Sequence, residues 1–149
     1  MLKKLKILLM DSEKNSCDEM QEFIQREGFI VLTAHSAAEG QLVLQRMPID
    51  ILILDIRLPD ANGLEVLKES KSRYPKLEVI VISGHGDMDS VIQALHLGAL
   101  DFLRKPLRLM DLQSAIERSQ KSQINDIAIF LPNEKIPLSL RPSVKIVGR

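Results

Sequence analysis

Three acids, two hydroxyl groups and one lysine in this sequence stand where their side chains could do chemistry together. Asp55 and Ser83 end apolar stretches of strand length, and the others follow such stretches: Asp11, Ser12, Glu13 and Lys105. Carboxylates held close together repel and stay ionised only if a cation lies among them, and oxygen clusters attract hard ions such as Mg²⁺. An aspartate can be the nucleophile in phosphoryl transfer, which needs positioning and charge cancellation. Asp55 is therefore the candidate acceptor.

Two other residues of this set suit the binding of a phosphoryl group. Lys105 could pair with a phosphoryl oxygen as a point charge, and the hydroxyl of Ser83 could donate a hydrogen bond to another. Taken singly, each of them fits an ordinary loop or strand-end residue, and Asp55 fits the start of a turn. Their joint presence favours the chemical interpretation.

These residues would meet only if the apolar stretches form one parallel sheet. Five stretches have strand length and alternate with helical periods: 6–10, 29–34, 50–55, 77–83 and 100–104. Strands that are apolar on both faces indicate a parallel sheet covered on both sides by helices, so the predicted class is a doubly wound α/β fold. In such sheets ligands bind beyond the carboxyl ends of the strands.

Five helices are expected between and after the strands. The second has apolar spacing at Gly40, Val43, Leu44 and Met47, and in the fourth Met88, Val91, Ile92 and Leu95 follow the same pattern. We expect these apolar stripes to be the faces that cover the sheet. Ser36 is the expected cap of the second helix, and Gly40 is expected at a close contact between helix and sheet.

Composition limits the possible partners and locations. A chain of 149 residues with 45% hydrophobic content fits one domain, and its 20 basic and 20 acidic residues give no net charge. No global field therefore favours nucleic acid or an anionic membrane, and we expect this chain to bind neither. The single cysteine, Cys17, excludes an internal disulfide and suits the cytoplasm. No window reaches the roughly 18 apolar residues of a membrane span.

Four ordered motifs resemble the receiver domains of bacterial two-component response regulators. They are "ILLMDSE", "DILILDIRLPDANG", "VIVISGHGD" and "GALDFLRKP", and the resemblance covers residues 5 to about 120. It implies a flavodoxin-like sheet of order 2-1-3-4-5 with five helices and a receiver domain over 1–121. Residues 122–149 carry three prolines and no helical stripe, so we expect a linker or irregular tail there. "SGHGD" and "VKIVGR" also resemble regulators of the nitrogen-regulation type that activate sigma-54 polymerase.

The resemblance gives roles to individual residues. It implies that Asp55 is phosphorylated by a sensor histidine kinase, with Ser83 and Lys105 contacting the phosphoryl group. It implies a Mg²⁺ site made by Asp11, Asp55 and the backbone carbonyl of Arg57. Such a domain is a signalling switch rather than an enzyme, with self-catalysed transfer and autodephosphorylation at most.

The resemblance also implies how the signal leaves the site. Ser83 and the aromatic Phe102 are expected to change position on phosphorylation, which alters the surface of the fourth helix, the fifth strand and the fifth helix. That surface is the expected site of homodimer formation, and a C-terminal effector domain is expected in a longer chain. Pro59 and Gly63 are expected to shape the loop after Asp55.

One position departs from the family pattern. Receivers usually carry two adjacent aspartates after the first strand, whereas this chain has Asp11 followed by Ser12. We expect weaker Mg²⁺ binding through Asp11, Asp55 and water, with Glu13 or Ser12 as a further candidate ligand, and we expect acceptor activity to survive.

Two other functions use the same residues. A degenerate receiver would bind proteins without being phosphorylated. Ser12, in place of the usual second aspartate, is the reason for this alternative. A metal-dependent phosphohydrolase would use the same acidic edge, although Arg57 stands where an aspartate-based phosphatase carries a second aspartate. The three histidines share no ligand spacing and are expected to be surface residues: His35, His85 and His96.

Overall fold

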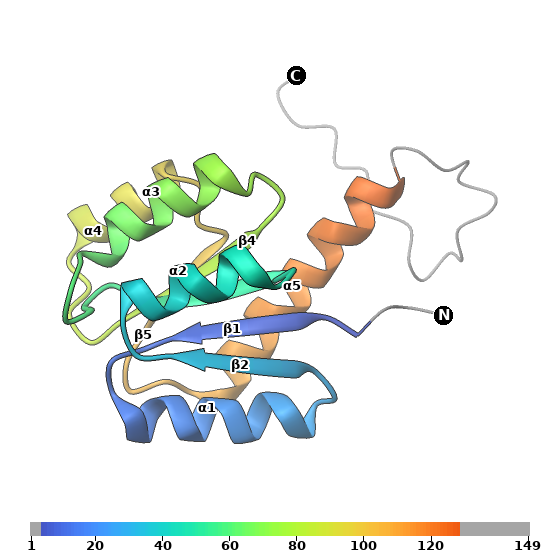
Figure 1. The fold of residues 1–149 in the computed structure, drawn as a ribbon, viewed down its shortest axis with the longest axis horizontal. Helices are drawn as coiled ribbons and strands as arrows, with labels where there is room; N and C mark the ends of the chain where they lie inside the picture. Colours follow the sequence, from blue (N-terminus) through green and yellow to red (C-terminus); the bar gives the residue numbers. More distant parts are fainter. Residues whose placement is uncertain (1–3, 129–149) are drawn as a thin grey trace.

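The structure, a computed structural model, describes residues 4–128, with the side chains of residues 4–122 (Figure 1). Its strands are β1 (Lys6–Met10), β2 (Ile30–Ala34), β3 (Ile51–Asp55), β4 (Glu78–Ser83) and β5 (Asp101–Arg104). Its helices are α1 (Lys14–Arg26), α2 (Ala37–Arg46), α3 (Gly63–Arg73), α4 (Met88–His96) and α5 (Leu109–Ala128). Strands and helices alternate along the chain, which confirms the predicted α/β class.

All five strands lie in one parallel sheet of order β2-β1-β3-β4-β5. This is the order that the resemblance implied. The first strand has the predicted bounds, and each of the other four begins one residue later than expected. Every residue of β3 is buried, as expected for a central strand with apolar side chains on both faces.

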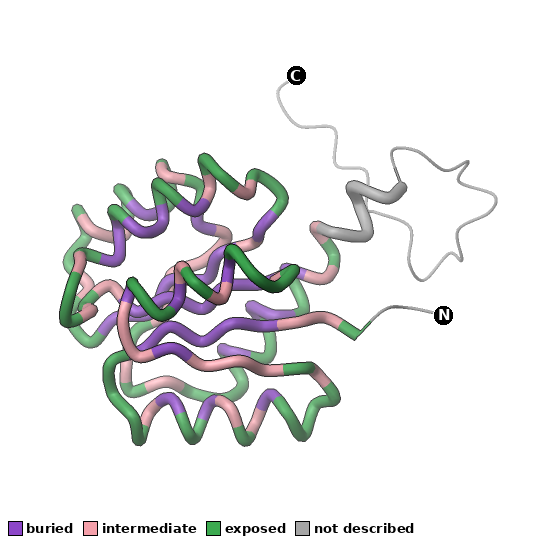
Figure 2. The backbone as a smooth tube through the Cα atoms, viewed as in Figure 1, coloured by how far each residue is buried: buried purple, intermediate pink, exposed green. Residues whose placement is uncertain are grey.

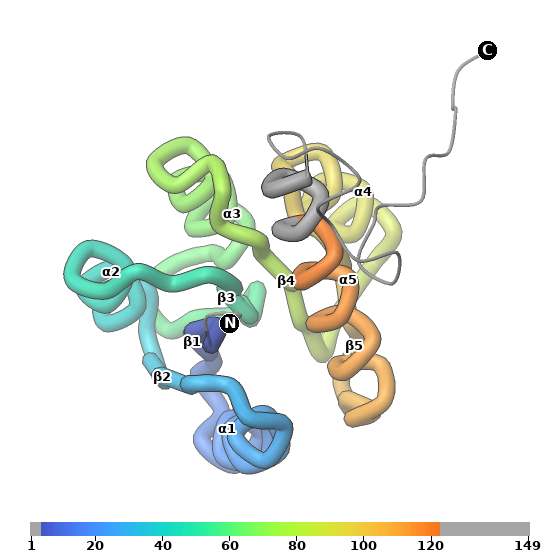
Figure 3. Tube along the Cα trace, turned by 90° about the vertical axis from the view of Figure 1, so that its right-hand side faces the viewer, coloured from blue at the N-terminus to red at the C-terminus, as the bar shows by residue number. Residues whose placement is uncertain are grey.

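Alternate residues of the central strands supply two separate cores, because successive side chains point to opposite faces of a sheet. Leu52 and Leu54 pack with residues of α2, α3 and α4, whereas Ile51 and Ile53 pack with residues of α1 and α5. The end view shows α1 and α5 on one side of the sheet and the other three helices opposite (Figure 3). Buried positions accordingly follow the central strands and the inner faces of the helices, whereas the edge strand β2 is mostly intermediate (Figure 2).

The predicted cap and the predicted close contact of α2 are confirmed, whereas Met47 of its expected stripe lies past the helix and is exposed. The hydroxyl of Ser36 accepts a hydrogen bond from Glu39 N at 3.1 Å and caps the helix. Gly40 is buried directly against Met10 of β1, and a Cβ at this position would collide with the methionine side chain. The glycine therefore allows α2 to approach the sheet closely.

The predicted orientation of α4 is wrong. Met88, Ile92 and Leu95 are exposed to 68%, 46% and 49%, whereas Ala94 is fully buried. The helix turns its small residue toward the sheet, so three residues of its apolar stripe face solvent and the fourth, Val91, is partly buried. Spacing predicts that a helix has an apolar stripe, but the packing of the neighbouring helices decides whether the sheet covers it.

The fifth helix also differs from expectation. We expected irregular structure from residue 122, but α5 continues to Ala128, because no glycine or proline interrupts the sequence over this range. The hydroxyl of Ser122 donates to Glu78 Oε1 at 3.1 Å and ties the helix to β4. The rest of the expected tail, 129–149, lies outside the described residues. Among the described helices, none combines the length and the apolar character needed to cross a membrane.

Candidate functional site

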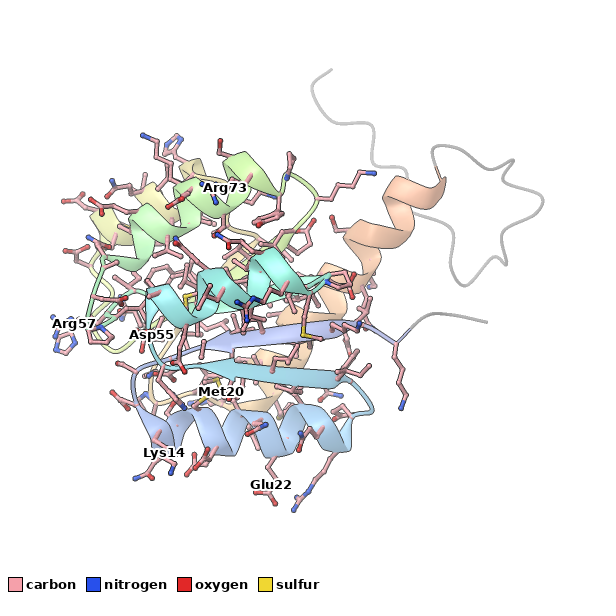
Figure 4. All side chains as sticks on the ribbon, in the orientation of Figure 1. Lys14, Met20, Glu22, Asp55, Arg57 and Arg73 are labelled. Carbon is pink, nitrogen blue, oxygen red and sulfur yellow. The ribbon has the colours of Figure 1, made fainter. Side chains whose placement is uncertain are left out.

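Four of the predicted site residues lie together at the carboxyl edge of the sheet. Asp11 follows β1, Asp55 ends β3, Ser83 ends β4 and Lys105 follows β5. Asp55 pairs in register with Ile82, so Ser83 is one residue further along the neighbouring strand. Asp55 and Arg57 lie at the end of the sheet toward which the strand arrows point (Figure 4).

Lys105 joins the two aspartates. Its Nζ lies 3.0 Å from Asp55 Oδ2, and 3.2 Å and 3.1 Å from the two oxygens of Asp11. Asp11 is fully buried, and Asp55 is only 4% exposed. One ammonium therefore faces two buried carboxylates, so one of the two buried negative charges is not offset.

The pKa values of Asp55 and Lys105 are both shifted by burial and by their charged neighbours. Burial raises the pKa of Asp55, and the carboxyl of Asp11 adds to this, against the lowering by Lys105 and the N–H of Arg57. Burial alone would lower the pKa of Lys105, but the hydrogen bonds and negative charge of Asp55 and Asp11 outweigh it and raise the pKa. Lys105 is therefore protonated at neutral pH, whereas burial makes the ionised form of Asp55 less favourable than it would be in water.

Ser83 and Phe102 lie beside this group. Ser83 is buried, and its hydroxyl accepts a hydrogen bond from the N–H of His85 at 3.0 Å. The backbone carbonyl of Ser83 accepts from the N–H of Lys105 at 2.8 Å, which ties the two site residues together. Phe102 is partly buried, packs against the core shared with α2, α3 and α4, and lies so close to Gly86 that a Cβ there would be 2.8 Å from its ring.

Two loops bring further polar groups to the same edge. Arg57 N donates to Asp55 Oδ1 at 3.0 Å, and the carbonyl of Arg57 accepts a hydrogen bond from the hydroxyl of Ser12 at 3.1 Å. Glu13 N donates to Asp11 Oδ1 at 2.9 Å. The Glu13 carboxylate lies 3.7 Å from Lys105 Nζ, with its side chain 67% exposed. The sequence predicted that these residues are near the site but not the contact between Ser12 and Arg57.

Asp60 and His35 have contacts at this edge that the sequence interpretation missed. The carboxylate of Asp60 accepts hydrogen bonds from the N–H groups of Ala37 and Ala38 at 2.8 Å and 3.0 Å, so the loop after β3 caps α2. The ring Nδ1 of His35 lies 2.9 Å from the carbonyl oxygen of Asp11, and this histidine is partly buried rather than a surface residue. The sequence carries a signal for this contact, because His35 directly follows β2 and so lies at the same edge of the sheet as the other strand ends.

The donor set of this edge suits a hard cation. Within residues whose side chains the structure describes, no three His, Cys, Asp or Glu side chains form a metal cluster. Asp11, Asp55 and the Arg57 carbonyl nevertheless supply three hard oxygens beside a buried negative charge that is not offset, and Mg²⁺ usually combines one or two carboxylates with retained waters. The residues therefore fit Mg²⁺, with few protein ligands. Chemically, the arrangement can receive a dianionic group at Asp55 and offset its charge.

Comparisons with known proteins agree with this geometry. The model of the response regulator receiver domain family matches residues 7–117. The alginate biosynthesis transcriptional regulatory protein AlgB of Pseudomonas putida is 37% identical over 101 residues, which are 68% of this chain and 22% of that protein. The DNA-binding transcriptional regulator NtrC of Proteus hauseri is 32% identical over 157 residues, 99% of this chain and 33% of that protein. The chain spans a third or less of both regulators.

Solved structures show the same fold. A receiver domain protein from Clostridium thermocellum is 34% identical with a TM-score of 0.74, covering 85% of this chain and 99% of that one. The receiver domain of NtrX from Brucella abortus is also 34% identical, with a TM-score of 0.70 over 76% of this chain and 96% of that one. The matches to NtrC and NtrX confirm the expected likeness to nitrogen-regulation-type regulators. The chain belongs to the response regulator receiver domain family, which serves in two-component signalling.

Proposed function

We propose that this chain is a phosphorylation-dependent switch whose acceptor is Asp55. The proposal rests on one observation: the Lys105 ammonium, which lies within 3.2 Å of Asp11 and Asp55, leaves one of two buried carboxylates uncompensated. In the reaction an Asp55 carboxylate oxygen forms a bond to phosphorus while the bond between phosphorus and a histidine nitrogen of a sensor kinase breaks. The reaction is promoted by the domain itself, so the domain is not an enzyme in the ordinary sense.

Each neighbouring group has a part in that reaction. Lys105 pairs with a phosphoryl oxygen and offsets the added charge, because its pKa is raised by Asp55 and Asp11 and it stays protonated. The hydroxyl of Ser83 accepts a hydrogen bond from the N–H of His85 at 3.0 Å. In the phosphorylated domain this hydroxyl turns and donates to another phosphoryl oxygen. The N–H of Arg57 already fixes the second oxygen of Asp55, so the acceptor is oriented before the phosphoryl group arrives.

Mg²⁺ belongs to this proposal as the cofactor. Asp11, Asp55 and the carbonyl of Arg57 would hold it, with water in the remaining positions. When bound, the ion supplies positive charge that the transferred phosphoryl group needs. Glu13 is less suited as a ligand, because its side chain is 67% exposed and already lies near Lys105.

The output surface in this proposal is the face made by α4, β5 and α5. Phe102 lies in β5 beside Gly86 of the loop before α4, so a movement of Ser83 and this loop changes its environment. Exposed apolar residues flank it on both helices: Met88, Ile92, Leu95, Leu109 and Met110. This face suits a homodimer, and Ile92→Glu should abolish dimer formation by the phosphorylated chain in sedimentation velocity experiments.

The remaining assignments follow from the family and the composition. We assign the chain through the end of α5 to the receiver domain and the residues after it to a linker toward an effector domain in a longer chain. A sensor histidine kinase is the partner that supplies the phosphoryl group, in the cytoplasm. The balanced charge of the chain supports binding to neither nucleic acid nor membrane.

Exposure to acetyl phosphate and Mg²⁺, followed by intact mass measurement, tests the proposal. The wild type should gain one phosphoryl group and Asp55→Asn none. Asp60→Asn is the matched control, because Asp60 is an exposed aspartate of the same loop and should leave the gain intact. No gain on the wild type would favour a phosphorylation-independent binding module, and rapid turnover of an added phosphoester would favour a phosphohydrolase.

A further inference from the structure

Ser12 contacts the backbone carbonyl of Arg57, which is a Mg²⁺ ligand in the proposed function. Its hydroxyl donates to the carbonyl oxygen of Arg57 at 3.1 Å, across 45 positions of sequence. The contact joins the loop after β1 to the loop after β3. An aspartate at this position, as in the usual family pattern, could not donate such a hydrogen bond when ionised.

The hydrogen bond occupies one of the two lone pairs of the Arg57 carbonyl oxygen. The N–H of Arg57 donates to Asp55 Oδ1 at 3.0 Å, and its carbonyl accepts from Ser12. The same residue forms an isolated β-bridge with Asn62, which caps α3 through a hydrogen bond from Leu64 N at 2.9 Å. The loop after the acceptor is therefore fixed by contacts made within the protein alone.

We propose that Ser12 is a positioning residue that holds the Arg57 carbonyl in place of the metal and thereby lowers the affinity for Mg²⁺. This inference rests on the proposed function, because it takes the Arg57 carbonyl as a metal ligand. The hydroxyl hydrogen carries positive charge and points at the same oxygen as the cation would approach. Binding of Mg²⁺ at this oxygen would then compete with the hydroxyl hydrogen, and the hydrogen bond would be weakened or lost.

The size of the effect follows from the value of one hydrogen bond. A net contribution of about 1 kcal/mol corresponds to roughly a fivefold change in dissociation constant. Ser12→Ala removes the competing donor without adding a ligand, so it should bind Mg²⁺ about fivefold more tightly than the wild type. If Ser12 merely lacks the carboxylate of an aspartate, Ser12→Ala should leave the affinity for Mg²⁺ unchanged. If Ser12 were itself a metal ligand, Ser12→Ala should weaken Mg²⁺ binding.

Mg²⁺ titrations of the full chain, followed through backbone amide chemical shifts, measure this affinity without any phosphorylation. Ser12→Thr keeps the hydroxyl and should match the wild type, whereas Ser12→Asp adds a carboxylate and should bind more tightly than Ser12→Ala. Ser16→Ala is the matched control, because Ser16 lies nearby in α1 and donates no hydrogen bond that the structure records. Hydrogen exchange without metal supplies a second readout, in which Ser12→Ala should speed exchange of the Arg57 amide.

The outcomes separate this inference from the proposed function. Tighter binding by Ser12→Ala, together with faster Arg57 exchange, supports a competing hydrogen bond. Equal or weaker binding by Ser12→Ala overturns it, even if the wild type accepts a phosphoryl group from acetyl phosphate. Failure of the wild type to accept a phosphoryl group would overturn the proposed function and would leave the measured order of metal affinities to decide the role of Ser12.

Discussion

Lys105 Nζ lies 3.0 Å from Asp55 Oδ2 and is shared with Asp11, whose carboxylate is fully buried. One cation between two buried anions is an unfavourable arrangement for stability, because only one of the two charges is offset. The same arrangement prepares the site to bind a cation and a phosphoryl group. The following predictions test its consequences for stability and chemistry.

Lys105→Met should lower the free energy of unfolding by about 2 kcal/mol, between the values for exposed and buried ion pairs. The substitution leaves Asp11 and Asp55 facing each other without a counter-ion. Urea denaturation at pH 7 measures the change, with Lys121→Met on the exposed side of α5 as the control that should alter stability little. If Lys105→Met is as stable as the wild type, the two carboxylates do not depend on this ammonium.

Asp55→Asn should increase the free energy of unfolding at pH 7. Burial raises the pKa of Asp55 in the folded protein, so its ionised form is less favourable there than in the unfolded chain. As pH falls, the wild type should gain stability relative to Asp55→Asn between the raised pKa and the ordinary value of 3.8. Unfolding curves at several pH values measure this difference.

Asp60→Asn supplies the opposite sign in the same experiment. Hydrogen bonds from the N–H groups of Ala37 and Ala38 lower the pKa of Asp60, so its carboxylate favours the folded state at neutral pH. The variant should be less stable than the wild type at pH 7, and the difference should fade as pH falls below 3.8. The same direction of change for both aspartates would contradict the assignment of their environments.

Gly63→Ala should lower the free energy of unfolding by about 2 kcal/mol and slow phosphoryl acceptance, because the added Cβ has no space. A Cβ at Gly63 would lie 2.5 Å from the backbone oxygen of Asp55 and 2.6 Å from the Cα of Ile56, and backbone atoms cannot move aside cheaply. Gly84→Ala is the matched control at the same edge, since a Cβ there meets nothing within 4 Å. Thermal unfolding and the rate of phosphoryl gain check both effects. Equal behaviour of the two variants would show that the site tolerates displacement at Gly63.

Cys17 should be unreactive toward thiol reagents in the folded protein. It is fully buried in α1, and burial, with the charges of Asp11 and Asp18, raises its pKa to about 11. Labelling with an aromatic disulfide at pH 8 should proceed only at the rate of unfolding. Asn15→Cys introduces an exposed thiol in the same helix and should react at once; rapid labelling of Cys17 itself would show that α1 opens readily.

Much of this fold could be predicted from the sequence because the central strands are apolar on both faces. The run 51–55 cannot form a half-exposed strand, so a covered parallel sheet and a common edge for Asp11, Asp55, Ser83 and Lys105 followed. Their closeness was therefore predictable from strand ends alone. The bounds of the strands could be predicted to within one residue for the same reason.

Contacts that depend on tertiary packing could not be predicted in this way. The stripe of α4 at Met88, Ile92 and Leu95 has the spacing of a buried face, yet the structure buries Ala94 instead. The contact between Ser12 and Arg57 joins two loops, and its geometry is set by the ends of β1 and β3 rather than by a local pattern. Asp60 likewise resembles an ordinary turn residue until the structure shows it capping α2.

The central claim is that Asp55 itself carries the phosphoryl group. Borohydride reduces an acyl phosphate to an alcohol, so treatment of the phosphorylated chain should convert the acceptor aspartate to homoserine, which peptide mass mapping can locate. We predict homoserine at position 55 alone, dependent on prior exposure to acetyl phosphate. Homoserine at position 11 or 60, or phosphate that survives on Ser12 or Ser83, would contradict the account.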